Sequence, residues 1–175
     1  MPSIGHVAVG LAAARLVRRP AGTGAGTWRG GLVLLALLPD ADVVAFRLGI
    51  PYGAPFGHRG AAHSLAVAVA CGLLCAALAG RGRGAVCWGM VAGLVVASHG
   101  LLDTLTDGGR GIALLWPWSN ARFFAPWRPI PVAPIGLGML TARGLEVILI
   151  EAVLFLPLFA LGLYGTESAS VERSR

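Results

Sequence analysis

The chain has 175 residues, of which 56% are hydrophobic and only 13% are charged, and its mean hydropathy is +0.75. This composition excludes an ordinary soluble domain and favours an integral membrane protein. The net charge of +6 rests on arginine alone, because the sequence has no lysine, and the arginines stand singly or in pairs beside apolar runs. That arrangement argues against a nucleic-acid partner and is typical of charges that set membrane topology.

Five apolar segments follow one another along the chain. They are residues 4–17, 31–50, 61–80, 85–105 and 144–165. Lipid tolerates only helices or closed barrels, and these runs are too long and too unbroken for barrel strands. The sequence therefore predicts an all-α fold: an integral membrane helical bundle of about four to five apolar helices that forms a single domain, residues 1–165.

Two further segments differ in composition from the apolar runs. Residues 106–142 are rich in Trp and Pro, which predicts a long loop at the membrane interface, with a lid over a site as the alternative. Residues 166–175 are polar and are predicted to form a disordered tail. The three cysteines lie within apolar runs and are interpreted as small buried hydrophobes.

Histidine and aspartate gather where the apolar segments begin or end. The eight side chains are His6, His58, His63, His99, Asp40, Asp42, Asp103 and Asp107. If successive segments cross the membrane in alternate directions, all eight reach the same membrane face. Ionisable groups within apolar helices are costly and mark functional sites. The convergence predicts a metal site at this face.

The local spacing of these residues supports a shared site. His99 and Asp103 are four residues apart and so share a helix face, which Asp107 extends if the helix continues. Pro39 interrupts the second segment beside Asp40, which can aim the carboxylates of that segment inward. Imidazole with carboxylate favours Zn²⁺, with manganese or iron as alternatives. One tetrahedral ion needs only four ligands, and there are eight candidates. Either two ions share the site, or some of the eight residues orient the ligands or take part in catalysis without binding the metal.

Four short blocks also carry a family resemblance. They are Gly5-His6, Leu38-Pro39-Asp40-Ala41-Asp42, His58-Arg59-Gly60-Ala61-Ala62-His63-Ser64 and Ser98-His99-Gly100-Leu101-Leu102-Asp103. Together they resemble the YdjM-like family of membrane-bound metal-dependent hydrolases, over about residues 1–128. The order of ligands is more distantly similar to that of the zinc-dependent phospholipase C and single-strand nuclease group, which implies phosphoester hydrolysis. Ala62 stands where members of the YdjM-like family commonly have Thr.

These observations predict a metal-dependent hydrolase, in which metal-activated water attacks an ester, with the phosphoesters of lipids as the expected substrate class. The predicted metal ligands are His6, Asp40, His63, His99 and Asp103. The predicted catalytic residues are Asp42, His58, Asp107 and Arg59. The first three of these either complete the ligand shell, serve as general base or are mere neighbours, and Arg59 is either a phosphate clamp or a topology charge.

Two other functions fit the same residues. A metal or proton transporter would also place His and Asp within the membrane, although it needs polar groups across the whole span. A membrane scaffold with a structural metal is the other alternative. Eight arginines fall on the face away from the predicted site and six on the site face, which predicts an inner-membrane protein whose site faces outward. The lipid bilayer is the expected partner.

Overall fold

The computed structural model describes residues 3–20 and 22–164, and every regular element among them is a helix, as the all-α prediction requires. The elements are α1 (Ser3–Leu16), α2 (Ala25–Leu37), the 3₁₀ helix η1 (Leu38–Val43), α3 (Val44–Arg47), the 3₁₀ helix η2 (Ala61–His63), α4 (Leu65–Leu78), α5 (Arg83–Thr104), the 3₁₀ helix η3 (Gly136–Leu140), α6 (Ala142–Leu154) and α7 (Leu156–Tyr164). The predicted tail, residues 166–175, lies outside the described residues.

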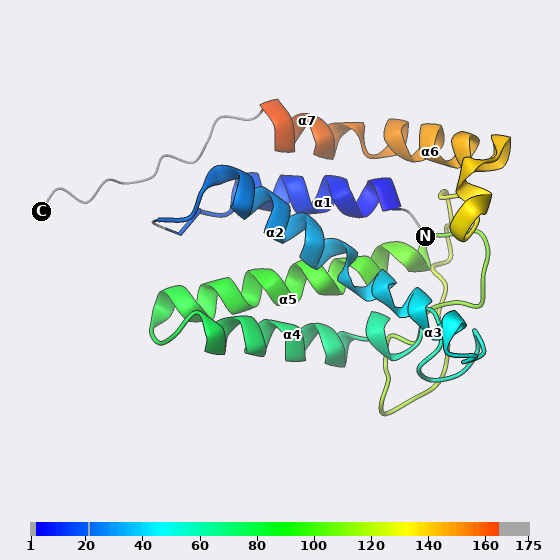
Figure 1. Cartoon of the computed structure of the whole chain (residues 1–175), viewed down its shortest axis with the longest axis horizontal. Coiled ribbons are helices and arrows are strands. Elements are labelled where there is room, and N and C mark those ends of the chain that lie inside the picture. The colour runs from blue at the N-terminus through cyan, green and yellow to red at the C-terminus, as the bar shows by residue number, and fades with distance from the viewer. Residues whose placement is uncertain (1–2, 21, 165–175) are drawn as a thin grey trace, which may run out of the picture.

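The long helices run roughly along the longest axis of the molecule (Figure 1). Helices α4 and α5 form a hairpin, while α1 packs against α2 and α7. The α1–α2 and α4–α5 connections lie together at one end, which we call the hairpin end. At the opposite end, called the loop end, η1, α3 and η2 gather with the long connection between α5 and η3.

Among the described helices, only α5 is both long enough and apolar enough to cross a membrane by itself. Helices α6 and α7 would qualify together as one broken span, but they are bent by 64° relative to each other. Pro157 lies at the start of α7, where its ring and missing N–H interrupt the helix. The fifth predicted segment is therefore two helices, and the predicted bundle of four to five spans is not confirmed.

Helices α4 and α5 pack through small residues and expose large ones. A Cβ added to Gly72 would lie 2.6 Å from the carbonyl oxygen of Gly89, so the two backbones approach closely. On the outer faces of the same helices, Leu73 is 67% exposed and Leu94 is 68% exposed. Small residues inside and large apolar residues outside are the arrangement expected where lipid surrounds the helices.

Candidate metal centre

Four of the predicted ligands converge at the loop end. Asp40 comes from η1, His63 from η2, and His99 and Asp103 from the last turns of α5. Each offers one ligand atom, and the four atoms all lie within 4.8 Å of one another. His63 Nε2 is 3.5 Å from Asp40 Oδ1 and 3.5 Å from Asp103 Oδ2, and His99 Nε2 is 3.2 Å from Asp40 Oδ1. We call these four residues the ligand cluster.

The backbone around the ligand cluster explains how three elements reach one point. His99 and Asp103 are four residues apart in α5, so both lie on the buried face of that helix. Between them in the sequence, Gly100 faces η2, where an added Cβ would overlap the carbonyl oxygen of His63. Glycine at this position therefore lets η2 pack directly on α5 and brings His63 to the cluster.

Both imidazoles of the ligand cluster are held through their other ring nitrogen. His99 Nδ1 donates to the carbonyl oxygen of Ala36 at 2.7 Å. Pro39 has no N–H, so it cannot give that carbonyl the three-residue bond of a 3₁₀ helix. His63 Nδ1 lies 3.1 Å from Asp42 Oδ2. Both contacts turn the Nε2 atoms toward the carboxylates, which is how metal-binding histidines are commonly fixed.

His6 borders the ligand cluster from α1 without joining its tight group of atoms. Its ring stacks on the ring of His99, with centroids 3.6 Å apart and an interplanar angle of 13°. Its Nε2 lies 3.5 Å from Asp103 Oδ1. The structure therefore places all five predicted ligands together, with four in a compact group and His6 beside them.

Asp42 and His58 form a layer outside the ligand cluster. His58 Nδ1 donates to Asp42 Oδ1 at 2.6 Å, while the backbone N–H of Arg59 donates to Asp42 Oδ2 at 3.0 Å. Asp42 thus bridges His58 and His63, and these three residues make a second group of candidate ligands. The arrangement suits residues that orient a ligand or exchange protons beside it.

Arg59 is buried against Asp103, with only 1% of its side chain exposed. Its Nε lies 3.1 Å from Asp103 Oδ2, and its Nη1 donates to Thr106 Oγ1 at 3.0 Å and to the carbonyl oxygen of Gly108 at 3.1 Å. The residue adopts a positive φ of 62°, an uncommon backbone conformation for a side chain other than glycine. These contacts place the Arg59 side chain against Asp103 and not at an exposed membrane face, while its Nη2 is buried without a hydrogen-bond partner among the described residues.

The structure does not bring Asp107 to the other candidates. Helix α5 ends at Thr104, so the face that carries His99 and Asp103 does not continue to Asp107. The Asp107 side chain is exposed and its Oδ1 accepts a hydrogen bond from the backbone N–H of Val132 at 2.7 Å. Asp107 holds the long loop in place and takes no part in the ligand cluster.

Two residues that support the site have no counterpart in the sequence prediction. Glu151 of α6 is buried, and its Oε2 accepts from the backbone N–H groups of Ile4 and Gly5 at 3.0 and 3.4 Å. It therefore caps the helix that carries His6. Arg122 donates to five backbone carbonyl oxygens, those of His58, Arg59, Gly111, Tyr52 and Ala54.

Burial and charge test whether a metal ion fits the ligand cluster. The carboxylate oxygens of Asp40 and Asp103 and the Nε2 atoms of His63 and His99 are buried and have no hydrogen-bond partner among the described residues. With neutral imidazoles, the carboxylates of Asp40, Asp42 and Asp103 outweigh the guanidinium of Arg59 by two negative charges, and a proton on His63 would reduce this excess to one. Buried atoms of this kind require a partner, and a divalent cation would satisfy both the atoms and the charge. Nitrogen and oxygen ligands in this set fit Zn²⁺.

The fold and the cluster together define an all-helical protein with a candidate metal centre at one end. The family described as YdjM inner membrane protein matches residues 1–169, and the chain belongs to this family. The chain is also 47% identical over 123 residues to the inner membrane protein YbcI of Escherichia coli (strain K12), covering 68% of this chain and 70% of that relative. No solved structure matches the chain. The family resemblance predicted from the sequence blocks is thus confirmed.

Proposed function

We propose that this protein is a metal-dependent hydrolase of the inner membrane that cleaves an ester bond, with phosphoesters of lipids as its substrate class. The observation that carries the proposal is the convergence of four buried ligand atoms, from Asp40, His63, His99 and Asp103, that have no hydrogen-bond partner among the described residues. A cation at this point would give a partner to the two Nε2 atoms, which face the carboxylates of Asp40 and Asp103. The distant similarity to zinc-dependent phospholipases supports the substrate class.

In this proposal Asp40, His63, His99 and Asp103 hold the metal, with His6 beside them. A bound Zn²⁺ supplies Lewis acidity and lowers the pKa of water to about 7. The protein groups orient the ligands: the carbonyl oxygen of Ala36 holds the ring of His99, and Asp42 holds the ring of His63.

Proton transfer is the second task that the chain must perform. His58 is the proposed general base, because its Nδ1 is already bonded to Asp42 and its ring is buried beside His63. Asp42 stabilises the protonated ring after transfer, since its ionised carboxylate accepts from Nδ1. Arg59 keeps Asp103 in place during the reaction and so acts through a ligand.

We further propose that the apolar helices form a bundle of four to five membrane spans, with the loop end facing outward. The exposed leucines of α4 and α5 support contact with lipid on those helices. Six arginines lie on or beside the helix ends at the hairpin end: Arg15, Arg18, Arg19, Arg29, Arg81 and Arg83. Six also lie on the loop side, but Arg59 and Arg122 contact protein groups there, so the remaining balance supports the hairpin end as the cytoplasmic side.

Metal analysis tests the premise directly. The full chain would be purified in detergent, stripped with a chelator, reloaded with Zn²⁺, and its bound zinc measured for the wild type, His99→Ala and Asp103→Asn. Asp107→Asn is the matched control, since it makes the same carboxyl-to-amide change outside the cluster. We expect one zinc per chain in the wild type and control, and loss of zinc in the two cluster variants. Unchanged stoichiometry in both cluster variants would remove the premise.

A screen of phospholipids and phosphodiesters with the zinc-loaded protein tests the reaction. Hydrolysis that disappears in His99→Ala but persists in Asp107→Asn is the expected result.

One alternative function, a membrane scaffold with a structural metal, has specific support. Structural zinc sites are closed to solvent, and the ligands here are almost fully buried, with His99 and Asp103 0% exposed. Unfolding on chelation without hydrolysis of any ester would favour that structural role. Zinc uptake into proteoliposomes would favour transport.

A further inference from the structure

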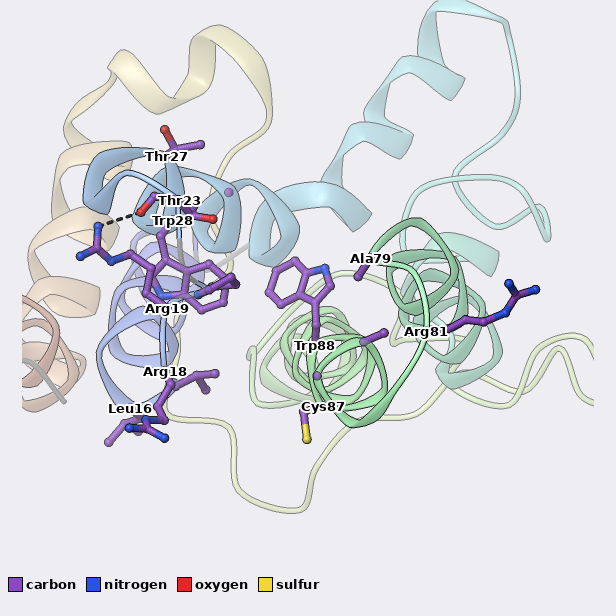
Figure 2. A pocket seen from close by; sticks show the side chains of 15 residues that line it. Leu16, Arg18, Arg19, Thr23, Thr27, Trp28, Ala79, Arg81, Cys87 and Trp88 are labelled. Atoms are coloured by element: carbon purple, nitrogen blue, oxygen red, sulfur yellow. Dashed lines mark hydrogen bonds between the residues drawn. The ribbon is translucent and has the colours of Figure 1, made fainter. Parts of the chain in front are cut away.

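A second functional region lies at the hairpin end, remote from the ligand cluster. There a groove of about 1250 Å³ opens between the α1–α2 connection and the α4–α5 connection. Figure 2 shows the indole rings of Trp28 and Trp88 in this groove, with Arg18 and Arg19 on one side of Trp88 and Arg81 on the other. Nothing in the proposed hydrolase reaction uses these residues.

The charge of the groove is uniformly positive. Arg18, Arg19 and Arg81 line it, and the two stretches of sequence that supply its lining, residues 16–31 and 79–88, contain no Asp or Glu. The side chains of Arg18 and Arg81 are exposed. Arg19 has a structural contact as well, since its Nη1 donates to the carbonyl oxygen of Thr23 at 2.8 Å. The groove therefore presents guanidinium groups to an anion from outside the chain.

The apolar part of the groove is aromatic, with Trp88 half-buried and Trp28 behind it at 7% exposure. The ring centroids of Trp28 and Trp88 are 5.0 Å apart, and Trp28 Nε1 donates to the carbonyl oxygen of Ala14 at 2.9 Å. Leu16, which also lines the groove, is 65% exposed. Tryptophan is enriched at the level of the lipid headgroups, where its ring meets apolar chains and polar groups together.

We propose that this groove binds the headgroup of an anionic phospholipid, with the arginines on its phosphate and the indole rings against its glycerol and upper acyl region. This inference rests on the proposed bundle of membrane spans, in which the helix ends at the hairpin end lie at the level of the lipid headgroups. A free anion would use the arginines but not the apolar wall, and a nucleic acid would need a longer basic surface. The proposal does not depend on the metal centre or on its reaction.

Lipid titration of the full chain in detergent, followed by native mass spectrometry, tests this proposal. The probes are phosphatidylglycerol and phosphatidylcholine with the same acyl chains. Arg18→Gln combined with Arg81→Gln removes two groove charges and leaves Arg19 with its contact to Thr23. Arg47→Gln combined with Arg128→Gln is the matched control, because it removes the same charge from exposed arginines at the loop end. Helix content measured by circular dichroism verifies that each variant is folded.

The groove variant is expected to bind phosphatidylglycerol roughly thirtyfold more weakly, since each arginine near a membrane surface contributes a factor of about five. Binding of phosphatidylcholine should not change, and the control should retain the wild-type preference. Arg18→Lys combined with Arg81→Lys keeps both positive charges. This variant should therefore retain most of the preference for phosphatidylglycerol over phosphatidylcholine. Equal weakening in the groove variant and the control would overturn the proposal, as would complete displacement of phosphatidylglycerol by millimolar inorganic phosphate.

Discussion

The two ends of the molecule treat charge in opposite ways. At the loop end, Asp103 is 0% exposed and Arg59 is 1% exposed, and the two are in contact. At the hairpin end, Arg18 and Arg81 are exposed on a groove whose lining segments contain no carboxylate. Both ends are ionic, yet only one of them has removed its charges from solvent.

Burial explains why the two ends have different architectures. A charge removed from solvent costs several kcal/mol unless it is paired and hydrogen-bonded, so the groups of the loop end can exist only as a mutually compensating set. Exposed arginines remain solvated, so they carry little such cost and do not need a nearby group of opposite charge. Substitutions at the loop end should therefore disturb stability and metal binding together, whereas those at the hairpin end should affect only an external ligand.

The largest effect is expected for Asp103→Ala. This change removes a ligand and leaves Arg59 buried without its carboxylate, which should lower the free energy of unfolding by about 3–5 kcal/mol. Thermal unfolding in detergent and zinc analysis would measure the two losses. Asp107→Ala, which removes an exposed carboxylate with one backbone hydrogen bond, should cost about 1 kcal/mol and keep the zinc. Similar losses in the two variants would contradict the buried pair.

A smaller effect is expected for Asp42→Asn. The amide can no longer stabilise the proton on His63 Nδ1 as a carboxylate does, so zinc affinity should fall about 10–100-fold. Competition with a chelator of known affinity measures this change, with Asp107→Asn as the control of equal chemistry. An unchanged affinity would show that Asp42 does not orient the ligand.

Glu151→Ala tests the support of the loop end from a distance. The variant loses the acceptor for the backbone N–H groups of Ile4 and Gly5, which should destabilise the protein by about 1 kcal/mol and weaken the placement of His6. Glu146→Ala changes an exposed residue of the same helix that pairs with Arg143, and should have almost no effect. Urea or thermal unfolding of the two variants under one condition provides the comparison. Equal destabilisation would argue against the cap.

The smallest effect should come from the hairpin end. Arg18→Gln combined with Arg81→Gln should change the free energy of unfolding by no more than about 0.5 kcal/mol, because both side chains are exposed. Zinc content should remain that of the wild type. A loss of zinc in this variant would mean that the two ends are coupled, and the contrast between them would then fail.

Helical spacing and the alternation of apolar segments made part of the loop end predictable. His99 and Asp103 share a face of α5 because they are four residues apart, and Asp40 follows the break that Pro39 introduces. Asp107 could not be placed in this way. The end of α5 depends on local bonds such as Thr106 Oγ1 to the carbonyl oxygen of Asp103, and on the distant contact of Asp107 with Val132.

The contributions of Glu151 and Arg122 leave no pattern in the sequence, for a different reason. Both side chains bind backbone atoms, Glu151 at the start of α1 and Arg122 on the carbonyl oxygens around His58. Every residue type has a backbone carbonyl, and all except proline have a backbone N–H. The segments that Glu151 and Arg122 bind therefore need no particular side chain, and their sequence does not indicate the contact. Only the tertiary arrangement identifies these contacts. The break between α6 and α7, by contrast, had a visible cause in Pro157.

The two fixed imidazoles differ in how easily mutation can release them. The ring of His63 rests on the side chain of Asp42, and a single base change can replace that aspartate. The ring of His99 rests on the main-chain carbonyl of residue 36, which every amino acid supplies. Random mutagenesis should therefore recover many lesions that free His63 but few that free His99, and those few should be changes that move the backbone of α2, with Pro39 the first candidate.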